Sequence, residues 1–143
     1  VGSGSEDGPD LATMLEYQVI IWFSGDKYGS KSKSAGPSAL DEQNLATYLD
    51  SNGRLFLISQ DYLYDMGLTT FGENYLGVSA YTSDVSTSEI VGQTGDPIGD
   101  GFGDLTMNYP INDYSDSLTV AAIASTAFVN DSIKTGFGFS VII

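Results

Sequence analysis

The sequence contains no cysteine and no histidine. Without cysteine, the chain has no disulfide, no thiol nucleophile and no thiolate metal site. Without histidine, it lacks the most common general base, the Ser-His-Asp arrangement and the most frequent zinc ligand. Carboxylates, hydroxyls, tyrosines and a few lysines are what remain for chemistry. These absences favour a protein that is not an enzyme, and calcium is the one cofactor that we consider.

Basic residues are also scarce. The chain carries 19 acidic residues against 5 basic ones, which gives a net charge of -14 at pH 7. A surface of this sign repels phosphate backbones and anionic lipids. No apolar run approaches the roughly 20 residues that a membrane-spanning helix needs. We therefore expect no nucleic-acid partner and no membrane insertion, and the acidity with so little lysine favours a secreted, extracellular protein.

The chain has the length and composition of one folded domain. It has 143 residues, of which 41% are hydrophobic and 17% are charged, enough apolar material for a core. The opening "VGSGSEDG" has the composition of a flexible linker, which we expect over residues 1–8. A single α/β domain over residues 9–143 should follow, and it reads as a possible fragment of a larger chain.

Two segments of the first half repeat the same order of elements. "LATMLEYQVIIWFS" and "LATYLDSNGRLFLIS" each read as a helix followed by a strand rich in β-branched and aromatic residues. Ser38 and Asp41 have the spacing of a capping box, which predicts the start of the second helix. Apolar runs such as 19–23 and 55–58 are typical of parallel strands that are buried on both faces. The pattern predicts two neighbouring parallel strands.

The second half of the chain has a different residue pattern. Short β-type runs alternate there with Gly, Asp and Asn turns, so this half should be rich in strands. We expect strands near residues 89–91, 105–108, 118–123 and 137–143. The run "TVAAIASTAFV" fits a buried helix equally well, because periodicity does not separate the two at this length.

The segments "DGPDLATMLEYQVIIWFSGD", "LDEQNLATYLDSNGRLFLISQDYLYD" and "FGENYLGV" together resemble an α/β domain of large secreted bacterial proteins, often found beside peptidase and adhesion modules. That domain is related to class I glutamine amidotransferases. The resemblance implies a three-layer, flavodoxin-like (Rossmann-like), mostly parallel sheet. The family begins with a further strand and helix, and we expect both to be absent from this sequence. Amidotransferase activity needs cysteine and histidine, so it does not carry over.

Two Ser-x-Asp elements stand directly after the two predicted parallel strands. Ligands of open parallel sheets bind beyond the carboxyl ends of the strands. The candidate ligand-binding residues are therefore Ser24, Asp26, Gln60, Asp61 and Tyr62. Carboxylates on adjacent strands would repel one another and favour a shared cation. The alternative is that each Asp caps the turn or helix after its strand.

A second acidic motif lies in "GDPIGDGFGD". Asp96, Asp100 and Asp104 recur every four residues among glycines, which allows oxygen ligands to converge but lacks the EF-hand spacing. Plain turns are the alternative there. The full set of candidate metal ligands is Asp26, Asp61, Asp96, Asp100 and Asp104.

The function that these observations favour is a non-catalytic structural or interaction domain of a secreted, modular protein, with calcium as a candidate ligand. Its partners would be other domains of the parent chain or neighbouring subunits. One alternative is a hydrolase that uses Asp26 and Asp61 on a sugar or an ester. Another is a self-assembling subunit that completes its sheet with a strand from another chain.

Overall fold

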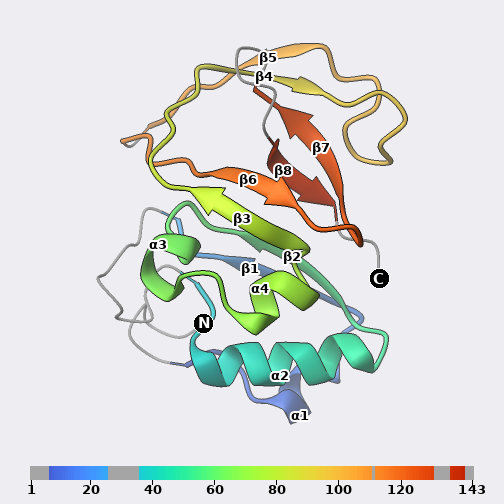
Figure 1. Ribbon diagram of the computed structural model, residues 1–143. Helices are drawn as coiled ribbons and strands as arrows, with labels where there is room; N and C mark the ends of the chain where they lie inside the picture. Colours follow the sequence, from blue (N-terminus) through green and yellow to red (C-terminus); the bar gives the residue numbers. More distant parts are fainter. Residues whose placement is uncertain (1–6, 26–35, 111, 131–135, 141–143) are drawn as a thin grey trace. The chain divides into compact units, whose positions relative to one another are not determined.

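The computed structural model describes residues 7–25, 36–110, 112–130 and 136–140 (Figure 1). The chain divides after Phe71 into two compact units. The first unit holds a parallel strand pair with helices, and the second holds an antiparallel sheet. The expectation of a single domain over residues 9–143 remains a prediction.

The first unit consists of two successive helix-strand modules, as the repeated segments predict. The first module is α1 (Leu11–Met14) followed by β1 (Val19–Phe23), and the second is α2 (Ala39–Asp50) followed by β2 (Arg54–Ile58). The short helix α3 (Tyr62–Met66) comes next, and α4 (Thr70–Asn74) spans the point where the chain passes into the second unit. The left-handed residue Asn52, with φ of 66°, lies between α2 and β2.

The predicted capping box at the start of α2 is confirmed. The Ser38 N–H donates to Asp41 Oδ2 at 2.8 Å, and the Asp41 N–H donates to Ser38 Oγ at 3.2 Å. Asp41 Oδ1 also accepts a hydrogen bond from the Gly8 N–H at 2.7 Å, while Ser38 Oγ donates to Asp7 Oδ1 at 2.8 Å. Asp7 and Gly8, which the sequence places in the linker, are therefore fastened to the start of α2.

Strands β1 and β2 lie side by side and run in the same direction, as predicted. Their register pairs Val19 with Arg54, Ile21 with Phe56 and Phe23 with Ile58. The connection between them contains α2, which is the long crossover that parallel strands require.

One face of this strand pair packs against the helices. Leu45 and Tyr48 of α2 are almost fully buried. The Tyr48 hydroxyl accepts a hydrogen bond from the Arg54 N–H at 3.2 Å, which fixes α2 against the start of β2. The Trp22 ring lies against Gly8, where a Cβ atom would collide with it. Trp22 therefore belongs to the core side of β1.

The prediction that these strands are buried on both faces is wrong. Along β1 and β2 the residues alternate between exposed and half-buried. The half-buried residues face the helices, whereas the alternate residues, including Ile21 and Phe56, are exposed. A continuous apolar run is typical of a parallel strand with two covered faces, but here the described helices cover only one.

The described residues of the second unit form six strands, so this half is strand-rich as the sequence indicates. Its sheet has the order β3-β6-β8-β7-β4-β5, and all the neighbouring strands are antiparallel. The strands are β3 (Val78–Thr82), β4 (Glu89–Gly92), β5 (Asp104–Thr106), β6 (Ser117–Val120), β7 (Ser125–Val129) and β8 (Gly136–Ser140).

The expected fold class, a three-layer flavodoxin-like and mostly parallel sheet, is therefore wrong. Parallel pairing is confined to β1 and β2 among the described residues, and the larger sheet is antiparallel (Figure 1). The physical reason lies in the connections: the described residues between β3 and β8 include none of the helices that parallel crossovers use. Within the described part of the chain, no helix is both long and apolar enough for a bilayer crossing.

Candidate functional site

The carboxyl ends of β1 and β2 meet at one edge of the strand pair, as the sequence predicts. The Ser24 N–H donates to the Ile58 carbonyl oxygen at 3.1 Å, which extends the ladder by one residue. Ser24 Oγ donates to Ser59 Oγ at 3.0 Å. The two Ser-x-Asp elements therefore begin side by side.

The structure describes one of the two aspartates predicted at this edge, Asp61. Asp26 lies outside the described residues, so its separation from Asp61 is not part of the described geometry. Asp61 is 7% exposed and occupies the N-cap position of α3, although its side chain accepts no capping hydrogen bond from that helix. Gln60, beside it, is half-buried. The metal and ligand roles of these residues remain predictions.

Tyr62 belongs to a buried polar cluster that ties α3 to α2. Its hydroxyl donates to Glu42 Oε1 at 2.5 Å, and Thr69 Oγ1 donates to the same oxygen at 3.1 Å. Burial, together with the Glu42 carboxylate beside it, raises the pKa of Tyr62 far above its ordinary value. A tyrosine held protonated in this way is a structural donor, and its ring is too deeply buried to stack on a ligand from solvent.

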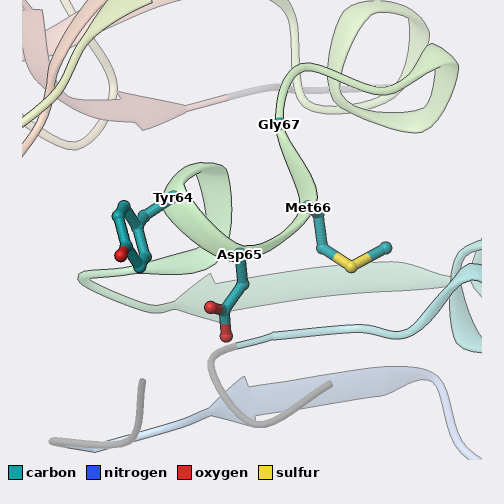
Figure 2. A pocket seen from close by; sticks show the side chains of 4 residues that line it. All are labelled: Tyr64, Asp65, Met66 and Gly67. Atoms are coloured by element: carbon teal, nitrogen blue, oxygen red, sulfur yellow. The ribbon is translucent and has the colours of Figure 1, made fainter. Parts of the chain in front are cut away.

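An open depression lies on α3 next to this cluster. It has a volume of about 570 Å³ and is lined by Tyr64, Asp65, Met66 and Gly67, which Figure 2 shows from close by. Tyr64 is exposed, and Gly67 ends the helix with φ of 70°. The four lining residues are consecutive, so no second element within the described part of the chain supplies an opposing wall, whereas ligand pockets bury most of the ligand surface. This depression is therefore a weak candidate for binding a small molecule.

Asp96 is a turn residue in the second unit. Its Oδ1 accepts hydrogen bonds from the N–H groups of Ile98 and Gly99, both at 2.9 Å. Its Oδ2 accepts one from Ser125 Oγ at 2.7 Å, at the start of β7. These bonds match the plain-turn alternative, in which the carboxylate closes an Asx turn and fastens it to a strand.

Asp100 and Asp104, the other members of this motif, are both exposed. Among the residues that the structure describes, no three carboxylates come together in a group that could hold a metal ion. Calcium binding by Asp96, Asp100 and Asp104 remains a prediction from sequence.

The most distinctive surface of the first unit is apolar. We call it the open face, and it consists of Val19, Ile21, Phe23, Phe56 and Ile58. These side chains are between 48% and 70% exposed. They share one side of the strand pair, because alternate residues of a strand point to the same face and the register sets Ile21 beside Phe56 and Phe23 beside Ile58. Scattered exposed apolar residues are common, but a contiguous group is not.

Sequence reasoning did not find the open face or the role of Glu42. The five apolar residues read as core, and only their exposure marks them as a surface. Glu42 does leave a signal, because Glu42, Leu45 and Leu49 fall at i, i+3 and i+7 on the buried side of α2. A carboxylate on that stripe calls for a buried hydrogen-bond donor.

Comparison with known proteins adds no assignment: no family model, no curated protein and no solved structure matches this chain.

Proposed function

We propose that this chain is a non-catalytic interaction domain of a secreted, modular protein, and that it binds its partner through the open face. The observation that carries the proposal is the exposure of Val19, Ile21, Phe23, Phe56 and Ile58 on one side of a parallel strand pair. Contiguous exposed apolar surface of this kind marks interaction sites on soluble proteins.

The size of the open face is sufficient for binding. Each of its five side chains leaves roughly 100 Å² in water, if a large apolar side chain offers about 150–250 Å² in all. Covering the resulting ~500 Å² would contribute about 12 kcal/mol of gross hydrophobic free energy. Association itself costs at least about 4 kcal/mol, so the surplus supports a reversible complex of moderate affinity.

The proposal is tested by binding of the uncharged dye Nile red to the intact chain. We define the open-face variant as the triple substitution Ile21→Thr, Phe56→Thr and Ile58→Thr, which keeps the β-propensity of the strands. Dye fluorescence should rise on the wild-type chain and fall back with the open-face variant. The matched control is Ile98→Thr, because Ile98 is 50% exposed and Ile58 is 48% exposed. Equal dye binding by the wild type and the open-face variant would refute the proposal.

The proposal also predicts an absence of turnover. The hydrolase alternative requires Asp61, so a panel of glycan and ester substrates should be screened with the wild type and with Asp61→Asn. Turnover by the wild type that disappears in Asp61→Asn would overturn a non-catalytic role and establish the hydrolase.

A further inference from the structure

We infer that the partner of the open face is an amphipathic α-helix of about three turns, which lies along β1 and β2 and places an acidic residue beside Arg54. This inference rests on the proposed function and names the chemistry of its partner.

The dimensions of the open face match one helix. Each of the two strands is 5 residues long, which corresponds to about 16 Å, and two strands span about 10 Å. A helix has a diameter of about 10–12 Å and covers 16 Å with about 11 residues. A single apolar stripe at i, i+3, i+4 and i+7 would therefore cover the open face completely.

The opposite side of the same strand pair shows how the pair is covered. There Leu45 and Tyr48 of α2 are buried, and the Tyr48 hydroxyl accepts a hydrogen bond from the backbone of β2. Parallel strands are stable with helices on both faces because each face presents apolar side chains. The open face, like the side that faces α2, consists of aliphatic and aromatic residues, and a helix can cover it in the same way.

A second copy of this chain fits less well. An ordinary stable interface buries about 800 Å² on each partner, whereas the open face offers roughly 500 Å². Two copies would also bring together two net charges of -14.

Arg54 indicates that the partner helix carries a negative charge. Among the described residues it is the single basic side chain. It is the first residue of β2, pairs in register with Val19, and lies on the same side as Phe56 and Ile58 by strand alternation. Arg54 is exposed at the rim of an apolar surface that has no acidic member, so it attracts a carboxylate of the incoming helix.

The probe for this inference is a synthetic peptide held helical by a side-chain staple, with leucines on one face and glutamate at both ends. A second peptide replaces these glutamates with lysines. Binding to the full chain is measured by fluorescence anisotropy, and circular dichroism checks the fold of each variant. The glutamate peptide should bind the wild type and Ile98→Thr equally. It should bind the open-face variant at least about tenfold more weakly, the factor that about 1.4 kcal/mol represents.

A charge exchange tests the role of Arg54. The variant Arg54→Glu should bind the glutamate peptide about fivefold more weakly and the lysine peptide about fivefold more strongly, and high salt should remove both differences. A merely structural role for Arg54 would lower the binding of both peptides together.

The outcomes separate the inference from the proposed function. Peptide affinities that do not respond to the open-face variant overturn the helical partner. Sedimentation of the wild type as a dimer, with the open-face variant monomeric, also overturns it and replaces the helix with a second copy, while the interaction role stands. Absence of peptide binding, dimer and dye binding together overturns both.

Discussion

The hydroxyl of Tyr62 offers a quantitative test of the packing between α2 and α3. The variant Tyr62→Phe removes the 2.5 Å hydrogen bond to Glu42 Oε1 and leaves the ring in place. Thr69 Oγ1 continues to donate to that oxygen at 3.1 Å. A hydrogen bond to a charged group contributes about 1.5–3 kcal/mol. Because one donor remains, we expect the free energy of unfolding to fall by about 2 kcal/mol.

The assay is equilibrium urea unfolding at pH 7, followed by circular dichroism, and two tyrosines of the same unit serve as controls. Among its described partners, the Tyr48 hydroxyl bonds only to uncharged backbone groups. It donates to the carbonyl oxygens of Tyr17 and Arg54 and accepts from the Arg54 N–H. Tyr48→Phe should cost about 1 kcal/mol. Tyr64 is exposed, and Tyr64→Phe should cost less than about 0.5 kcal/mol.

The double variant Tyr62→Phe with Glu42→Gln completes the test. The two substitutions act on one interaction, so their combined cost should fall short of the sum of the single costs by at least about 0.5 kcal/mol. A cost of Tyr62→Phe no larger than that of Tyr64→Phe, or strict additivity with Glu42→Gln, would refute the buried charged hydrogen bond.

Three further predictions concern the same kinds of contact. The raised pKa of Tyr62 means that the folded chain keeps this proton above pH 10, where the unfolded chain loses it. The contribution of Tyr62 to stability should therefore be constant below about pH 10 and fall above it. Urea unfolding from pH 9 to 11 checks this, and a slope equally steep in Tyr62→Phe would contradict it. Asp96→Ala leaves three described donors, including Ser125 Oγ, without their acceptor, and should lower the free energy of unfolding by about 3 kcal/mol. Thermal unfolding unchanged from wild type would rule this out. Ser38→Ala removes the cap of α2 and the hydrogen bond to Asp7, and it should cost about 1–2 kcal/mol. Thermal unfolding of Ser38→Ala that matches the wild type would contradict this.

Local signals in the sequence predicted the first unit well. Ser38 and Asp41 identify the start of α2 because a capping box needs only four consecutive residues. The two repeated helix-strand segments predicted the parallel pairing of β1 with β2, since a helix of this length provides the crossover.

Local sequence patterns did not predict the features that depend on residues far apart in the chain. The run "VIIWF" is apolar at every position, so it does not reveal that Ile21 and Phe23 are exposed while Trp22 faces the core. The run "TVAAIASTAFV" contains a turn in which the Ala124 N–H donates to the Ala121 carbonyl oxygen at 3.1 Å. No Gly, Pro, Asn or Asp marks this turn, so the run does not separate β6 from β7. The fold class depends on such connections, and there the prediction failed.

The candidate site divides in the same way. That Ser24 and Ser59 come together follows from the strand register, which the sequence indicated. The cluster of Glu42, Tyr62 and Thr69 joins residues up to 27 positions apart and depends on how α2 packs against the segment after β2. Packing of that kind leaves only a faint trace in the sequence, here a carboxylate on the buried stripe of a helix.

The most direct test of the central claim is the cost of a substitution on the open face of the unbound chain. Urea unfolding of Ile21→Thr should show a change of less than about 1 kcal/mol, as expected for a surface position. The reference is Leu45→Ala, which removes a side chain that is 0% exposed and should cost about 2–5 kcal/mol. A small effect at Ile21 beside a large one at Leu45 is the predicted result. If Ile21→Thr costs as much as Leu45→Ala, the open face is part of a buried core, and the account of it as a docking surface is contradicted.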